Sequence, residues 1–328
     1  MKKLRVGIIG AGFGVRVHRP AFERLRSCEI TATGSSARWK KIVCDPRVDA
    51  LSVAVVPRAQ AAILAACARE RKHIFFEKPL CADWKQAAAL RRIFASGGKT
   101  TMVDFELAEL ESWKKFRRIL LDGGLGRLRH AVIDWHLETY ANKFHLDSWK
   151  TKIRPGGGAL GAFGSHAFYH LEWLFGRAGK VSAHLFRFAG SAGDAETAFS
   201  CVFQMARGFP VFINVSTHSA SGGGHRILAE GDKGALRLEN KTADYVRGFR
   251  LFSADRRRNG WRRIRVPEMT LDSRDARISA VGCMAGRFTA AALAGKKIKP
   301  GFPEALRAQW LMERARHSSK IKKWVNCG

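Results

Sequence analysis

The chain has 328 residues, of which 46% are hydrophobic and 26% charged, and its formal charge at pH 7 is +30. The length is that of two domains of ordinary size, and the composition excludes a disordered or fibrous protein. No apolar run is long enough for a membrane span, and Arg5 interrupts the run after the first two lysines, so we expect neither membrane insertion nor a signal peptide.

The positive charge is compatible with nucleic acid, a membrane surface, an anionic substrate or a generally basic proteome. Basic residues are spread along the chain without a nucleic-acid-binding motif, so a nucleic-acid or polyanion binder is the less favoured interpretation. Seven scattered cysteines, none in CxxC spacing, predict a reducing, cytoplasmic location and no metal site. The densest basic group lies in a predicted strand-and-turn region with Asn259 and Gly260 at the turn, and comprises Arg256, Arg257, Arg258, Arg262, Arg263 and Arg265.

The first hundred residues alternate between short apolar strands and helices, which is typical of a doubly wound parallel sheet. Capping and glycine signals mark the ends of the helices. The predicted elements are, in chain order, strand Leu4–Ile9, a helix from about Val15, strand Glu29–Thr33, strand Ala50–Val56 before Pro57, helix Ala59–Arg71, strand His73–Phe76, and helix Trp84–Ser96, capped by Asp83 and ended by Gly97 and Gly98.

After Lys99 the strand-like segments lengthen and alternate, which predicts an open, mostly antiparallel sheet covered by helices on one face. The fold class is therefore α/β, with a doubly wound parallel sheet followed by an α+β domain. The predicted strands are Arg129–Leu137, Val181–Phe188, Ala198–Met205, Val211–Ser216, Arg226–Glu230 and Ala235–Glu239, and the predicted helices are Leu110–Leu121, His166–Phe175 and Glu304–Ser318.

A glycine-rich turn joins the first strand to the first helix, which is the context of a dinucleotide-binding turn. Gly10 permits the tight turn, Gly12 lets the backbone approach a pyrophosphate, and the helix N-terminus stabilises the anion. Gly14 falls one residue before the usual third glycine, so an ordinary glycine turn is an alternative. The cofactor-binding residues expected here are Gly10, Ala11, Gly12, Phe13 and Gly14.

The end of the second strand discriminates between NAD and NADP, because an acidic residue there binds the ribose hydroxyls and repels a 2′-phosphate. This chain has Ser35, Ser36 and Arg38 at that point and no carboxylate. Two hydroxyls and a guanidinium suit a phosphate, so we predict NADP(H) in preference to NAD(H). The alternative is that Arg38 is a solvated helix residue.

The tripeptide Glu77, Lys78 and Pro79 follows the fourth strand, at the edge where open α/β sheets bind ligands. Together with the glycine turn, the third strand that ends at Pro57, and a GGG segment before His166, this order resembles the Gfo/Idh/MocA oxidoreductases. The resemblance covers most of the chain. It extends to an H-x-P-A motif at His18, Pro20 and Ala21, a glycine-rich loop and helix at Gly156–Gly176, and the C-terminal helix.

The resemblance implies a Rossmann domain over residues 1–108 and a substrate-binding and oligomerisation domain over residues 109–328, whose helix 304–318 packs back near the junction. It also implies a homodimer or homotetramer. The implied activity is NAD(P)-dependent hydride transfer at a CH–OH group of a sugar, an inositol or a nucleotide-linked or acidic derivative.

Residue roles carried over from the family place Lys78 beside the nicotinamide, hydrogen-bonded to the reacting hydroxyl, and make His166 an acid or base. Tyr169, His170 and Asp104 are further catalytic candidates. The remaining cofactor contacts implied are Val56, Pro57, Glu77, Lys78 and Pro79.

Several positions depart from the family pattern. Ala162 and Tyr169 stand where the family often has aspartates, so a sensor or scaffold that binds NADP(H) without turnover is an alternative function. Gln60 stands where many members have a histidine. The segment between Ser36 and Asp49 is short, which predicts an abbreviated second helix and following strand.

Overall fold

The computed structural model describes residues 2–95, 97–244, 246–257 and 260–328. Its contacts divide the chain into two compact units, whereas the sequence predicts one boundary after residue 108. The first unit contains two later segments that such a boundary leaves out. Its parts are Met1–Glu106, Arg154–Gly156 and Thr270–Gln309, and those of the second unit are Leu107–Ile153, Gly157–Met269 and Trp310–Gly328.

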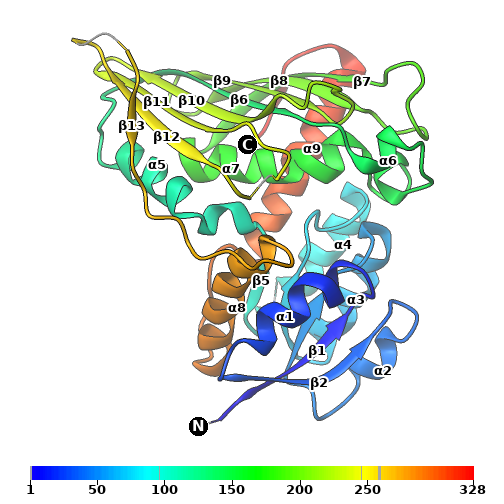
Figure 1. Cartoon of the computed structure of the whole chain (residues 1–328). Helices are drawn as coiled ribbons and strands as arrows, with labels where there is room; N and C mark the ends of the chain where they lie inside the picture. The colour runs from blue at the N-terminus through cyan, green and yellow to red at the C-terminus, as the bar shows by residue number, and fades with distance from the viewer. Residues whose placement is uncertain (1, 96, 245, 258–259) are drawn as a thin grey trace. The chain divides into compact units, whose positions relative to one another are not determined.

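A parallel sheet of five described strands organises the first unit, in the order β2-β1-β3-β4-β5 (Figure 1). The predicted doubly wound sheet is therefore confirmed. Short apolar runs form these strands because both faces of the sheet are covered by helices. The strands are β1 (Leu4–Ile9), β2 (Cys28–Gly34), β3 (Ala50–Val53), β4 (His73–Phe76) and β5 (Thr101–Val103).

The helices that the sequence predicts in this unit begin and end close to the expected positions. Asp83 caps its helix as predicted, by accepting a hydrogen bond from the backbone N–H of Gln86. The expected helix end at Ser96 lies outside the described residues. The helical elements are η1 (Gly14–His18), which is a π-helical turn, α1 (Arg19–Glu23), α2 (Trp39–Val43), α3 (Pro57–Arg69), α4 (Trp84–Phe94) and α8 (Arg277–Leu293), together with the first residues of α9 (Phe302–Ile321).

Elements α3, β3 and β5 differ from the sequence prediction for identifiable reasons, whereas α2 agrees with it. Pro57 is the first residue of α3, because proline is tolerated in the first helical turn, and β3 consequently ends at Val53 rather than at Val56. Strand β5 was not predicted, because three residues are too few to show a pattern of hydrophobicity in the sequence. Helix α2 is present and has only five residues, as the short segment before Asp49 predicts.

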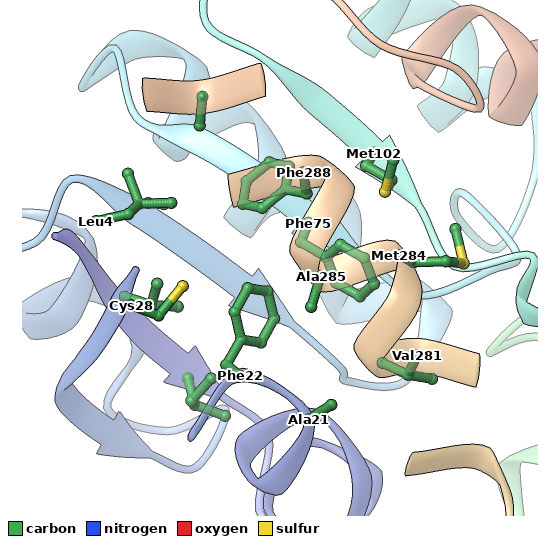
Figure 2. Packing of buried hydrophobic residues seen from close by; sticks show 14 of the residues in the cluster. Leu4, Ala21, Phe22, Cys28, Phe75, Met102, Val281, Met284, Ala285 and Phe288 are labelled. Atoms are coloured by element: carbon green, nitrogen blue, oxygen red, sulfur yellow. The ribbon is translucent and has the colours of Figure 1, made fainter. Parts of the chain in front are cut away.

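Alternate residues of β1 serve the two faces of the parallel sheet. Val6 and Ile8 belong to a buried cluster with α1 and α8, whereas the Gly7 backbone faces Ile42 of α2 and Leu51 of β3. Figure 2 shows the first cluster, in which the rings of Phe22, Phe75 and Phe288 meet edge to face. Helix α8 was not predicted, yet its apolar face completes the core of this unit.

The second unit is built on a mixed, mostly antiparallel sheet of nine described strands, in the order β13-β12-β11-β10-β6-β9-β8-β7-β14 (Figure 1). The β6–β9 pair is parallel and the other neighbours are antiparallel. The strands are β6 (Leu128–His136), β7 (Ala178–Phe186), β8 (Ala198–Met205), β9 (Pro210–Ser216), β10 (Gly224–Gly231), β11 (Gly234–Asn240), β12 (Arg250–Asp255), β13 (Arg262–Ile264) and β14 (Val325–Asn326).

Helices lie along one face of this sheet, as predicted (Figure 1). Of the arginine-rich region, Arg262 and Arg263 lie in β13, which pairs with β12, while Arg258 and Asn259 lie outside the described residues. The helical elements are η2 (Glu106–Glu109), α5 (Glu111–Leu121), α6 (Tyr140–Lys143), η3 (Trp149–Thr151), the π-helical turn η4 (Leu160–Gly164), α7 (Ser165–Phe175) and the rest of α9. No described helix combines the length and apolar character needed to cross a membrane.

Replacing Phe288 by alanine tests the place of α8 in the first core. The side chain is fully buried, so we expect Phe288→Ala to lower the free energy of unfolding by about 3–5 kcal/mol. Urea unfolding measures this change. Leu293→Ala, at a residue 39% exposed at the end of the same helix, is the control and should cost less than about 1 kcal/mol. Equal small effects would contradict the packing of α8.

Candidate active site

The three glycines of the turn after β1 differ in how much room the surrounding protein leaves for a side chain. Gly10 has φ +138°, and a Cβ atom there would overlap the carbonyl oxygen of Ala54. Gly14 packs in ordinary contact with Ala54 and Ile8, at 3.4 and 3.5 Å from an ideal Cβ position. Contacts within the protein therefore explain Gly10, whereas a Cβ atom at Gly14 would make only ordinary van der Waals contacts.

Gly12 is different, because nothing lies within 4 Å of the position that its Cβ atom would occupy. Gly12 and Ala11 are exposed at the start of a helix that continues through η1 and α1. A glycine that the protein's own packing does not require is what a close-approaching ligand requires. The N–H groups of this helix start suit an anion, so the turn fits the pyrophosphate of a dinucleotide.

The end of β2 presents the polar residues that the sequence singled out. Ser36 and Arg38 are exposed and Ser35 is partly exposed, and the N–H of Arg38 donates to the carbonyl of Ser35 in a turn before α2. Arg38 directly precedes α2, so it is not a residue of that helix. These groups follow a strand of the parallel sheet, as the glycine turn does.

The Glu77–Lys78–Pro79 segment directly follows β4. Its backbone is held by Gln60, a buried residue of α3, whose Nε2 donates to the carbonyls of Glu77, Pro79 and Leu80 at 2.6, 3.0 and 3.2 Å. Gln60 stands in the family's histidine position, and the structure gives it a role that the sequence did not reveal. Pro57 is buried at the start of α3, and Val56 before it is 40% exposed.

A buried cluster of hydrogen bonds lies beside this segment and centres on His18. The Nδ1 atom of His18 lies 2.8 Å from the hydroxyl of Ser52, and Nε2 lies 3.0 Å from Glu77 and 3.2 Å from Asp104. His18, Ser52 and Asp104 are fully buried, and the Glu77 side chain is 14% exposed. The ring of Phe13 meets that of His18 edge to face, with centroids 5.2 Å apart.

Burial and mutual charge shift the pKa values of this cluster. Burial lowers the pKa of His18, but the hydrogen bonds to Asp104 and Glu77 outweigh burial and raise it to about 9. Burial and the charge of Glu77 raise the pKa of Asp104 to about 7. Burial raises the pKa of Glu77, yet the hydrogen bond and charge of His18 outweigh burial and lower it. The imidazole is therefore protonated at neutral pH and offsets carboxylate charge.

A third carboxyl group, Glu106, lies near the same cluster. Burial and the charge of Asp104 raise its pKa to about 8, and the charge of Lys78 opposes that rise. The ligand atoms of His18, Glu77 and Asp104 all lie within 4.8 Å of one another, a spacing that a metal ion could also span. Their hydrogen bonds account for this spacing without a cation.

In the second unit, His166 and Tyr169 lie on α7. The GGG segment before this helix has its own geometric causes: Gly158 has φ +81°, and a Cβ atom there would overlap the carboxylate of Glu196. That carboxylate accepts the N–H of Leu160 at 3.0 Å. The helix is continuous through the π-helical turn η4, so Ser165 does not cap it; its hydroxyl instead donates to the carbonyl of Gly161.

Aromatic rings surround His166 and its neighbours. The His166 ring is 6.0 Å from that of Trp135 on β6 and 5.9 Å from that of His170. His225 of β10 stacks on Trp135 with ring centroids 4.2 Å apart. Burial lowers the pKa of His225 to about 3 and that of His170 well below its ordinary value. Both are therefore neutral, which makes His170 part of an aromatic wall rather than a charged group.

The predicted residues thus fall into two groups. The structure brings Gly10, Ser35, Glu77 and the other cofactor-binding candidates to one edge of the parallel sheet, because all five strands end there. His166 and Tyr169 belong to the other unit, so their joint action with Lys78 stays a prediction.

Sequence reasoning missed the roles of Ser52, Gln60 and Glu106 and the bridging position of His18. For Ser52 and Glu106 the available signal was a polar residue within or just after an apolar strand, the signal that singled out Glu77 and Lys78.

Comparisons with known proteins agree with this geometry. The model of the oxidoreductase family with an NAD-binding Rossmann fold matches residues 4–105, and that of the GFO/IDH/MocA C-terminal domain matches residues 113–237. An uncharacterized oxidoreductase from Synechocystis sp. is 29% identical over 284 residues, which are 76% of this chain and 75% of that protein.

Two sugar dehydrogenases are also similar to this chain. D-xylose dehydrogenase from Paenarthrobacter nicotinovorans is 30% identical over 162 residues, which are 47% of this chain and 42% of that enzyme. The solved structure of levoglucosan dehydrogenase in complex with NADH and levoglucosan has the same fold, with a TM-score of 0.88, 18% identity, and coverage of 99% of this chain and 100% of that one.

The two family models together cover all five strands of the first sheet and the second sheet from β6 into β11. The glycine turn and the Glu77–Lys78–Pro79 segment lie at the edge at which such a parallel sheet binds its cofactor. The chain therefore belongs to the Gfo/Idh/MocA family of oxidoreductases with an NAD-binding Rossmann fold.

Proposed function

We propose that this oxidoreductase moves a hydride between a nicotinamide cofactor and a carbinol or carbonyl carbon of a sugar-like or inositol-like substrate. The observation that carries the proposal is the position of Lys78, directly after β4, at the same sheet edge as the glycine turn after β1. The names of two relatives, a D-xylose and a levoglucosan dehydrogenase, support sugars as the substrate class.

Lys78 is the residue that handles the proton in this proposal. A bound oxidised nicotinamide would supply the hydride acceptor. The hydroxyl of the substrate loses its proton as its carbon loses the hydride, and the neutral amine of Lys78 accepts that proton and becomes an ammonium. In the reductive direction the ammonium polarises the carbonyl and returns the proton to its oxygen.

His166 is the proposed second acid or base, and it passes the proton between the site and water. Tyr169, the third candidate, stands where the family often has an aspartate. Its ring contacts those of His170 and Trp173, so an aromatic wall replaces a carboxylate at that position. We propose that Tyr169 orients the substrate rather than the His166 ring.

Replacing Lys78 by alanine separates binding from chemistry. We expect Lys78→Ala to bind NADPH, measured by fluorescence quenching, but to lose about a hundredfold or more in turnover, because the proton acceptor is gone. The assay uses D-xylose, levoglucosan and myo-inositol with NAD⁺ and NADP⁺. The control is Lys85→Ala, at an exposed residue of α4, which should keep full turnover. Undiminished turnover in Lys78→Ala would sink this assignment.

For the cofactor we propose a preference for NADP(H) over NAD(H). Ser35, Ser36 and Arg38 follow β2, where a carboxylate would select NAD(H), and Arg38 is exposed and able to reach a phosphate.

Fluorescence titration with the two reduced cofactors measures this preference. We expect NADPH to bind more tightly than NADH, and Arg38→Ala to weaken NADPH binding about tenfold while NADH binding changes little, because the lost contact is to the 2′-phosphate. Arg69→Ala is the matched control, since Arg69 is exposed at the end of α3, at the opposite edge of the sheet. Tighter binding of NADH would contradict the preference.

The oligomeric state, a homodimer or homotetramer, stays a prediction, as does the cytoplasmic location. Exposed aromatic residues on the second sheet support a homo-oligomer: Phe186 of β7 is 46% exposed and Phe212 of β9 is 38% exposed. An anionic substrate is compatible with the net charge of +30.

A further inference from the structure

One buried imidazole contacts side chains from three neighbouring strands of the parallel sheet. Ser52 belongs to β3, Glu77 follows β4, and Asp104 follows β5, and these three strands are adjacent in the sheet. His18, at the end of the π-helical turn η1, lies within hydrogen-bond distance of all three. A single side chain therefore connects the glycine turn's helix to the segment that contains Lys78.

The buried position and the charge of Glu77 and Asp104 both require a partner such as the His18 imidazole. Glu77 and Asp104 place two carboxyl groups in a region that is almost fully buried, where an unpaired carboxylate is costly. A doubly protonated imidazole donates from Nδ1 to Ser52 and from Nε2 to the carboxylates, and so satisfies both nitrogens. Apolar rings fill the remaining sides, with Phe13 and Phe75 each 5.2 Å from the imidazole between ring centroids.

We propose that His18 is a positioning residue for hydride transfer: its imidazole ties Glu77 and Asp104 to Ser52 and thereby fixes the place and the electrostatic surroundings of Lys78. The inference rests on the proposed function, in which Lys78 exchanges the substrate proton. His18 itself does not touch the substrate in this proposal and acts through Glu77, the residue before Lys78.

The charges around the imidazole favour its protonated form. Glu77 and Asp104 contact it directly, Lys78 and Glu106 influence these carboxyl groups by charge, and the Arg277 guanidinium lies over the Phe13 ring. Hydrogen bonds to the carboxylates outweigh burial and hold the pKa of His18 at about 9, against an ordinary 6.5. The positive charge is thus present below about pH 9 and is lost above it.

Gln60 of α3 provides a comparison, because it contacts the same segment. It holds the backbone carbonyls of Glu77, Pro79 and Leu80 but is neutral at every pH. Gln60→Met keeps a similar volume and removes the amide whose Nε2 donates these bonds, so it should loosen the segment without moving the pH–rate profile. Replacing a charged positioning residue should both loosen the segment and move the pH–rate profile.

The experiment compares four variants of the full chain. His18→Leu removes both donor and charge, and His18→Gln keeps an amide donor without the charge, which guards against a variant that fails to fold. Gln60→Met is the neutral comparison. His73→Gln is the matched control, because His73 is a buried histidine at the opposite end of β4, where its Nδ1 accepts the N–H of Thr100.

Each variant is compared with the wild-type enzyme in three measurements. Hydrogen exchange of the peptide that covers residues 77–82 reports on the segment, and the pH profile of turnover uses the sugar that the wild-type enzyme oxidises. Nitrogen NMR reports the protonation of the histidine rings. We expect His18→Leu to speed exchange and to lower turnover about tenfold or more, with His18→Gln in between. Both should move the pH–rate profile to higher pH, because losing a positive charge strengthens proton binding by the groups that remain.

In the wild-type enzyme, one histidine ring should stay doubly protonated up to about pH 9. Its signal should disappear in His18→Gln and persist in His73→Gln. Unchanged exchange and an unchanged pH–rate profile in both His18 variants would overturn the proposal. A stoichiometric divalent metal that purifies with the wild-type protein and is absent from His18→Gln would overturn it as well.

Failure of the proposed function gives a different result. If Lys78→Ala keeps its turnover while the His18 variants still speed exchange at residues 77–82, the proposed role of Lys78 is wrong, and His18 holds the segment in place without serving hydride transfer through Lys78.

Discussion

The parallel direction of the first sheet is the constraint on which the candidate site depends. Because β1 to β5 all run the same way, their carboxyl ends meet at one edge, and residues far apart in the sequence meet there as well. Gly10, Ser35, Glu77 and Asp104 each follow a different strand. The fold thus places the glycine turn, the loop that contains Arg38 and the segment that contains Lys78 at one edge, the edge where α/β sheets bind ligands.

That edge also has to hold buried charge. Glu77, Asp104 and Glu106 lie within a few residues of the ends of β4 and β5, and ionising all three in an apolar environment would be strongly unfavourable. His18 supplies a compensating cation, and part of the remaining cost is avoided by the raised pKa values of Asp104 and Glu106. In the proposed mechanism the same hydrogen bonds also set the charge around Lys78, so they would serve both the stability and the chemistry of this unit.

In the second unit, by contrast, buried histidines are neutral rather than charged. His170 and His225 are packed among tryptophan and phenylalanine rings, and burial keeps both neutral. His166 lies one turn from His170 on the same helix, directly after a π-helical turn, a feature that often marks functional sites. His18 likewise ends a π-helical turn. In each unit a locally widened helix therefore carries a histidine of the candidate site.

Sequence alone determined the alternation of strands and helices, the doubly wound and antiparallel sheets, the glycine turn and the placement of Lys78, because periodicity, capping and turn chemistry are local properties. It did not reveal α8, whose partners in the core are more than 170 residues away, nor the clamp by Gln60 or the bridging position of His18. The contacts of α8, Gln60 and His18 depend on which strands and strand ends become neighbours. Only the tertiary structure decides that, because hydrogen bonds between distant segments leave no period in the sequence.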